Sequence, residues 1–213
     1  MSTSLKIKVV QYMWGDHNLS YPLDRKINEV YCMRHGYEHV VYVHHPRNER
    51  FCRWEKIPVI QRELGNCDFL LFLDADAFFY SQELTIEEEL LPLLGNKDIM
   101  MAVDNASEKW RHHADTPNTG VILIRNSTIA FAMLDIWDQS SKHPDFENFR
   151  FKEHHKHDAC FYDFWQEYRD NVKLVKDYYL LNGLHGIYIR HLMASSDDRR
   201  LSVIQEYIDK NEL

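Results

Sequence analysis

The stretch Phe69–Tyr80, which reads FLLFLDADAFFY, places the strongest constraint on how this chain can fold. An unbroken apolar run leads into Asp74, and only Ala75 separates Asp74 from Asp76. A short apolar run bounded by polar residues is typical of a strand that is buried on both faces, as in a parallel sheet. The two carboxylates then lie at the carboxyl end of the strand, where open α/β sheets bind ligands.

Asp74 and Asp76 predict a metal site. Burying one carboxylate without a partner is costly and burying two is worse, so we expect a positive charge between them. Carboxylate oxygens suit a hard divalent cation such as Mg²⁺ or Mn²⁺. The alternative is that both aspartates cap the next element in water, which is the usual role of such a pair. The apolar run before the pair and the aromatic residues Phe78 and Phe79 after it favour the metal site.

The whole chain has the composition of a soluble globular protein, with 45% apolar and 27% charged residues in a length of 213. This length fits a single domain over residues 1–213. The formal net charge of -8 argues against a nucleic-acid-binding surface. The sequence shows no signal peptide and no apolar run long enough for a membrane span. Because the four cysteines form no close pair, we expect reduced thiols and a cytoplasmic location.

Apolar periodicity predicts strands and helices that alternate along most of the chain. The predicted strands cover residues 6–13, 38–44, 69–73, 99–103, 121–125 and 172–175. The predicted helices cover residues 21–35, 54–64, 87–94, 127–137, 158–168 and 201–207. Thr85 and Glu88 form a capping-box pattern before the third of these helices. This alternation predicts a three-layer α/β domain with a mainly parallel central sheet.

The order of short motifs resembles the GT-A glycosyltransferases. The motifs are HGYE, WEKI, FLDADAFF, NTGVILIRN and HGIYIRH, in that order. More narrowly, the sequence is similar to the galactomannan galactosyltransferase and xyloglucan xylosyltransferase family, over roughly Val10 to His191. It also resembles the first domain of chlorovirus multi-domain glycosyltransferases. The resemblance implies a Rossmann-like GT-A fold.

The same resemblance implies the activity and its metal. Members of the family transfer a sugar from a UDP-sugar donor to an acceptor hydroxyl, here on a glycan or glycoprotein, and retain the anomeric configuration. By this resemblance Asp76 ligates the metal directly, and Asp74 contacts the ribose or reaches the metal through water. His191 matches the third protein ligand, with His185 in reserve. A nitrogen ligand beside carboxylates favours Mn²⁺, with Mg²⁺ as a substitute.

The resemblance also implies which residues contact the donor. The residues expected at the nucleotide and the donor sugar are Gln11, Tyr12, Trp14, Arg53, Lys56, Asp74, Ala75, Asp104 and Asn118. Asp158 matches a family carboxylate and is expected to contact the transferring sugar. Simple packing is the alternative for Tyr12 and Trp14, a solvated basic face for the two cations, and a helix N-cap for Asp158.

Retention implies a front-face mechanism, in which the departing phosphate oxygen takes the proton of the acceptor. An inverting enzyme would need a carboxylate base, for which Asp158 and Asp115 are the candidates.

A phosphoryl-transfer enzyme of the haloacid dehalogenase type also places Asp-X-Asp after a strand, but it expects Thr or Val where Phe78 stands. A nucleotide-sugar-binding module without turnover remains an alternative.

Overall fold

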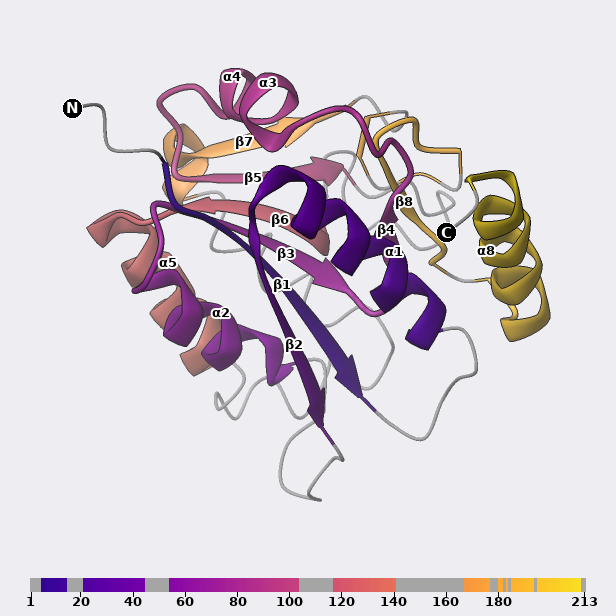
Figure 1. Ribbon diagram of the computed structural model, residues 1–213. Coiled ribbons are helices and arrows are strands. Elements are labelled where there is room, and N and C mark those ends of the chain that lie inside the picture. The colour runs from indigo at the N-terminus through magenta and orange to yellow at the C-terminus, as the bar shows by residue number, and fades with distance from the viewer. Residues whose placement is uncertain are drawn as a thin grey trace.

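The computed structural model describes residues 5–14, 21–44, 54–103, 117–140, 167–176, 180–181, 183, 185–193 and 195–211. In this part of the chain a sheet with the strand order β2-β1-β3-β6-β5-β7 forms the centre of the molecule (Figure 1). Its strands are β1 (Ile7–Trp14), β2 (Glu38–His44), β3 (Phe69–Asp74), β5 (Ile99–Val103), β6 (Pro117–Arg125) and β7 (Val172–Val175). A second, two-stranded sheet pairs β4 (Ala77–Phe79) with β8 (Ile189–His191).

The large sheet is mainly parallel, as predicted. Strand β1 runs parallel to both β2 and β3, and β5 runs parallel to β7. Strand β6 lies between β3 and β5 and is antiparallel to both. Its first residues therefore lie beside the last residues of β5, near the carboxyl ends of β1 and β3.

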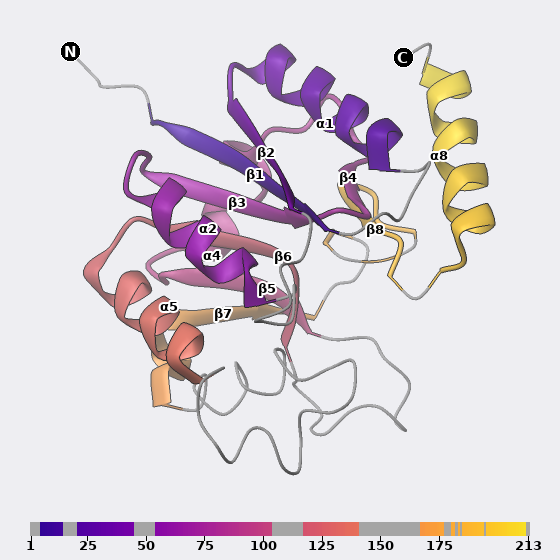
Figure 2. The same cartoon turned by 90° about the horizontal axis from the view of Figure 1, so that it is seen from below.

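Helices cover both faces of this sheet, so the domain has three layers (Figures 1 and 2). The helices are α1 (Tyr21–His35), α2 (Lys56–Leu64), α3 (Ile86–Glu89), α4 (Leu91–Leu94), α5 (Thr128–Ser140) and α8 (Asp197–Asn211), with a 3-10 turn at Arg169–Asn171. None of the helices in the described ranges combines the length and the apolar character needed to cross a membrane.

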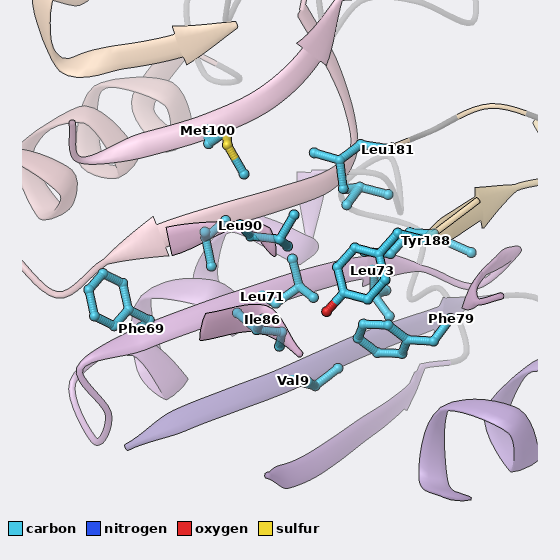
Figure 3. Close-up of a cluster of buried hydrophobic side chains, with 14 of the residues drawn as sticks. Val9, Phe69, Leu71, Leu73, Phe79, Ile86, Leu90, Met100, Leu181 and Tyr188 are labelled. Atoms are coloured by element: carbon cyan, nitrogen blue, oxygen red, sulfur yellow. The ribbon is translucent and has the colours of Figure 1, made fainter. Parts of the chain in front are cut away.

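Alternate residues of each strand point to opposite faces and build two separate cores. Val9 and Leu71 pack with residues of α1, α3 and α4 (Figure 3). Their neighbours Val10 and Leu70 pack on the other face with residues of α2 and α5. A third cluster joins Ile27 of α1 to α8 and β4. Together these cores hold the strands rigidly, and the carboxyl ends of β1 and β3 open toward β4 and β8.

The predicted strand 69–73 matches β3, after which the chain leaves the large sheet, turns at residues 75–76 and begins β4 at Ala77. The predicted elements 121–125 and 201–207 are longer in the structure, as β6 and α8. Residues 158–166 of the predicted helix 158–168 lie outside the described residues. The predicted helix 87–94 divides into α3 and α4, because Pro92 lacks an amide hydrogen and its ring clashes with a helical carbonyl. The predicted cap is confirmed: the amide of Glu88 donates to Thr85 Oγ1 at 3.1 Å.

Candidate active site

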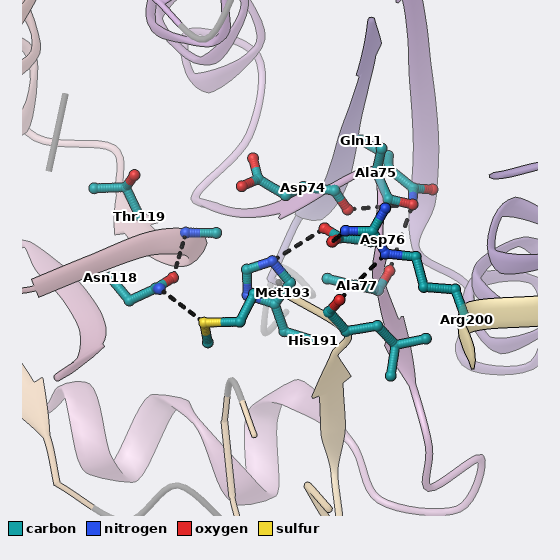
Figure 4. A network of polar contacts seen from close by, with 12 residues as sticks. Gln11, Asp74, Ala75, Asp76, Ala77, Asn118, Thr119, His191, Met193 and Arg200 are labelled. Atoms are coloured by element: carbon teal, nitrogen blue, oxygen red, sulfur yellow. Dashed lines mark hydrogen bonds and ion pairs between the residues drawn. The ribbon is translucent and has the colours of Figure 1, made fainter. Parts of the chain in front are cut away.

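The two-stranded sheet brings Asp76 and His191 together. Ala77, directly after Asp76, pairs with His191 in the β4–β8 register. The His191 Nε2 atom lies 3.0 Å from Asp76 Oδ1 (Figure 4). Both side chains are largely buried: 5% of the His191 side chain and 14% of the Asp76 side chain are exposed. An imidazole and a carboxylate that are distant in sequence therefore meet at the turn that follows β3.

Arg200 contacts the other oxygen of the same carboxylate. Its Nη2 atom lies 2.9 Å from Asp76 Oδ2. Arg200 belongs to the first turn of α8, and its Nε donates to the Leu192 carbonyl at 3.2 Å. Its Nη1 lies 3.4 Å from Asp197 Oδ1. Both oxygens of Asp76 thus have nitrogen partners, one from β8 and one from α8.

These contacts shift the pKa values of both members of the Asp76–His191 pair. Burial alone would raise the pKa of Asp76, but the charge and hydrogen bond of His191, together with Arg200, outweigh burial and hold it at about 2. Burial alone would lower the pKa of His191, but the charge and hydrogen bond of Asp76 outweigh burial and raise it. Asp76 is therefore ionised at neutral pH, and His191 retains a proton to a higher pH than an exposed histidine.

The start of β6 fits closely around His191. A Cβ atom on Gly120 would come within 2.1 Å of His191 Cε1, so only glycine leaves room for the ring. The Gly120 amide donates to Asn118 Oδ1 at 2.9 Å. The amide nitrogen of the Asn118 side chain lies 3.6 Å from Met193 Sδ. Asn118, expected at the donor sugar, here connects β6 to the segment after β8.

Two buried amide side chains support the turn that carries Asp76. Gln11 Nε2 lies 3.5 Å from the carbonyl oxygens of Asp74 and Ala75 and 3.4 Å from that of Ala77. Asn28 Nδ2 donates to the Ala77 carbonyl at 3.0 Å, and Asn28 Oδ1 accepts from the Phe79 amide at 3.0 Å. Gln11 was expected at the nucleotide, and the structure places it directly beneath the Asp-Ala-Asp turn.

Lys56 connects Asp74 to the start of β6. Its side chain is only 2% exposed, and its Nζ lies 3.3 Å from Asp74 Oδ1. The same ammonium donates to the carbonyl and the hydroxyl of Thr119 at 2.8 and 3.0 Å. Asp74 itself is 33% exposed. Lys56 can therefore orient Asp74 while part of that carboxylate stays accessible to a ligand.

Asp76 and His191 have the chemistry of two metal ligands. Their Nε2–Oδ1 distance of 3.0 Å is that of a hydrogen-bonded ion pair, and a carboxylate oxygen and an imidazole nitrogen are atoms that would hold a divalent cation. The carboxylate is ionised, and a neutral imidazole is a common ligand of transition metals. In the described ranges no three His, Cys, Asp or Glu side chains form a cluster that could hold a metal. A bound cation would complete its coordination with water or with oxygens of its substrate.

Several expected site residues lie outside the described residues: the side chain of Trp14, and Arg53, Asp104, Asp115 and Asp158. Of the others, Tyr12 is buried in the core between the sheet and α2, beside Trp54 and Ile57. His185, the reserve ligand, is exposed. The structure therefore brings together Gln11, Lys56, Asp74, Ala75, Asp76, Asn118 and His191.

Sequence reasoning did not identify Arg200, Asn28 or Asp24 as residues of this region. Asn28 and Asp24 lie on α1, where a polar residue among helical apolar positions suggests only an exposed face. Arg200 lies in a polar segment, LMASSDDRR, that carries no recognisable motif. No pattern in the sequence of α1 distinguishes Asp24 and Asn28 from exposed polar residues.

Solved structures of glycosyltransferases share this fold. A glycosyltransferase involved in the glycosylation of the major capsid of PBCV-1 has a TM-score of 0.73 at 14% identity, over 94% of this chain and 99% of that chain. A mutant of Drosophila beta-1,4-galactosyltransferase 7, in complex with manganese, UDP-Gal and xylobiose, has a TM-score of 0.57 at 13% identity, over 92% and 74% of the two chains. The fold of this chain is therefore the GT-A fold.

The sequence is also similar to curated proteins and to a family. Probable xyloglucan 6-xylosyltransferase 3 of Arabidopsis thaliana is 29% identical over 131 residues, which cover 58% of this chain and 26% of that protein. The chain thus spans about a quarter of the length of the curated relatives it matches. Residues 20–183, well over half of the chain, match the galactosyl transferase GMA12/MNN10 family. The chain belongs to this family of sugar-transferring enzymes.

Proposed function

We propose that this protein is a metal-dependent glycosyltransferase that moves a sugar from a UDP-sugar to a hydroxyl group of a glycan or glycoprotein. The observation that carries the proposal is the contact between Asp76 and His191 at the carboxyl end of β3. Open α/β sheets bind their ligands at this edge. The family membership and the manganese and UDP-Gal bound to the Drosophila neighbour support the same assignment.

Asp76 and His191 are the residues that would hold the metal. A divalent cation there would act as a Lewis acid on the diphosphate leaving group, whose negative charge grows as the sugar departs. The imidazole nitrogen favours Mn²⁺ over Mg²⁺. The chain contributes by keeping Asp76 ionised and by fixing the imidazole against Gly120.

Asp74 is the residue best placed to contact the donor directly. Lys56 holds one of its oxygens from the buried side, and the exposed part of the carboxylate can accept hydrogen bonds from the ribose. Lys56 is thereby a positioning residue in this proposal, because its ammonium is enclosed by Asp74 and Thr119. We propose retention of configuration, with the departing phosphate oxygen taking the acceptor proton.

Nucleotide release from a panel of UDP- and GDP-sugars, measured with Mn²⁺, with Mg²⁺ and with a chelator, tests the proposal. We expect release of UDP from one donor, stimulated by Mn²⁺ and abolished by the chelator. A clear preference for GDP-sugars would contradict the proposed UDP-sugar donor. Nucleotide release at an unchanged rate in the presence of the chelator would contradict the proposed metal dependence. Binding of a UDP-sugar in calorimetry without any release, in the presence of candidate acceptors, would instead identify a nucleotide-sugar-binding module.

A further inference from the structure

Asp24, in the first turn of α1, is a fully buried carboxyl group. Neither of its oxygens accepts a hydrogen bond from any residue that the structure describes. Buried carboxyl groups almost always have a partner, because burying one without a hydrogen bond or a counter-charge is costly. The contacts of Asp24 among the described residues therefore do not explain why this carboxyl group is buried.

The position of Asp24 points to the Asp76 site. Asn28 lies one helical turn further along α1 and on the same face, and it bonds to both Ala77 and Phe79 of β4. Helix α1 also packs against α8, which carries Arg200. Asp24 thus shares the face of α1 that contacts β4, close enough for the charges of Asp76 and Arg200 to act on it. Consistent with this placement, burial raises the pKa of Asp24, the charge of Asp76 raises it further, and the charge of Arg200 lowers it.

We propose that Arg200 is a resident counter-ion of Asp76 that competes with a divalent cation, and that Asp24 is the second carboxyl group to which its guanidinium moves when the cation binds, with any proton on Asp24 released to solvent as the guanidinium arrives. This inference rests on the proposed metal-binding role of Asp76 and His191. It names Arg200 and Asp24 as the residues that set how tightly this chain binds its cation.

The charges at the site support an exchange of partners. Arg200 neutralises Asp76 through its contact with Oδ2, so the buried carboxylate is balanced without any cation. A dication on Oδ1 and a guanidinium on Oδ2 would place like charges on one largely buried carboxylate, which is unfavourable where solvent screening is weak. Movement of the guanidinium to Asp24 would relieve this repulsion and would also give Asp24 the partner that it lacks.

The rest of Arg200 is suited to such a movement. Its other side-chain contacts are the Leu192 carbonyl and Asp197, a residue whose side chain is 60% exposed. The Arg200 side chain itself is 16% exposed, so it is not fully buried. The proposed exchange would move this side chain while Ile27, Phe78 and Ile204 hold α1, β4 and α8 together.

Calorimetric titration of the whole chain with Mn²⁺ tests the proposal. Arg200→Met removes the competing charge and should tighten Mn²⁺ binding about tenfold. Arg200→Lys keeps the positive charge. Its affinity for Mn²⁺ should therefore be closer to that of the wild type than the affinity of Arg200→Met is. Arg199→Met removes an exposed charge from the neighbouring position and should leave the affinity unchanged. Weaker or unchanged Mn²⁺ binding by Arg200→Met, with an intact circular dichroism spectrum, would overturn the proposal.

A double-mutant comparison tests the role of Asp24. Asp24→Asn should weaken Mn²⁺ binding severalfold in the wild type, because the guanidinium loses its second partner. The same substitution should have little effect in the Arg200→Met background, where no guanidinium needs a partner. Equal effects in both backgrounds would show that Asp24 acts on the cation directly and would overturn the exchange. Absence of any Mn²⁺ binding by the wild type would contradict the proposed metal site itself, whereas binding without the Arg200 effect would contradict only this inference.

Discussion

The ring of His191 lies against the backbone of Gly120 so closely that a Cβ atom there would come within 2.1 Å of Cε1. Strand β6 therefore fixes the imidazole by contact, and any side chain at this position must displace it. We expect Gly120→Ala to move His191 away from Asp76 and to weaken Mn²⁺ binding by about tenfold or more. We also expect a loss of unfolding free energy of about 1–3 kcal/mol from overpacking. Calorimetry with Mn²⁺ and chemical denaturation measure these two effects.

Gly65→Ala is the matched control for this substitution. Gly65 follows α2 with helical backbone angles, and a Cβ atom there would meet only the Arg62 carbonyl at 3.9 Å. This variant should bind Mn²⁺ like the wild type and unfold at the same or a slightly higher temperature. Unchanged Mn²⁺ affinity in Gly120→Ala would show that the position of His191 does not matter for the cation.

Asp76→Asn removes the charge that both His191 and Arg200 contact. We expect Mn²⁺-dependent release of UDP from the donor to fall by about a hundredfold or more, because the leaving group loses its electrostatic stabilisation. Asp198→Asn, an equivalent change at an exposed position of α8, should leave the rate unchanged. Steady-state kinetics of nucleotide release make the comparison, and a rate close to wild type in Asp76→Asn would remove this carboxylate from the mechanism.

The raised pKa of His191 predicts opposite effects of pH on cation binding and on the fold. A ligating histidine must be neutral, so the affinity for Mn²⁺ should rise as the pH rises through the raised pKa. Calorimetry from about pH 6 to about pH 8.5 measures this dependence. A profile in His191→Ala as steep as that of the wild type would assign the titration to another group.

Without Mn²⁺ the same ion pair stabilises the folded state only while His191 is protonated and Asp76 is ionised. The histidine contribution is fully present below its unfolded pKa and is lost as the pH rises through the raised folded pKa. The Asp76 contribution is fully present above its unfolded pKa and is lost as the pH falls toward about 2. The pair should therefore contribute most to the stability of the folded state between about pH 4 and about pH 6.5. Thermal unfolding measured across this range checks the prediction.

Lys56→Met should destabilise the protein and disturb Asp74. The side chain is buried, and its loss removes hydrogen bonds to Thr119 and the counter-charge of Asp74. We expect a loss of about 2–4 kcal/mol in unfolding free energy, since the partners stay buried or partly buried. Lys26→Met, at an exposed position of α1, should change stability by less than about 0.5 kcal/mol. Equal stabilities of the two variants in denaturant would contradict the supporting role of Lys56.

Much of the fold could be predicted because it depends on local patterns. The predicted helix over residues 21–35 matches α1, and the predicted strands 38–44, 99–103 and 172–175 match β2, β5 and β7. In these elements the apolar period and a terminating residue such as Gly36, with a φ of 74°, determine both the type and the ends. The order of the strands and the antiparallel β6 depend on packing between distant segments and are not visible in any local pattern.

The candidate site was predictable only in part, for a related physical reason. Asp76 stands out because a carboxylate after a buried strand needs a counter-charge. Asp24 does not stand out, because an acidic residue in the first turn of a helix is favourable even when it is exposed. Its burial results from the packing of β4 and α8 against α1. Arg200 reaches Asp76 only through the docking of α8, which no pattern of the LMASSDDRR segment predicts.

The separation of 115 positions between Asp76 and His191 has a consequence for the order of folding. Strands β1, β2 and β3 are close in sequence and can pair early, whereas closing so long a loop costs chain entropy before the β4–β8 contact offsets it. We therefore expect refolding to pass through a stage in which the β1–β2–β3 pairing has formed and the imidazole has not yet reached the carboxylate. The capacity to bind a cation would then be the last property that the chain acquires.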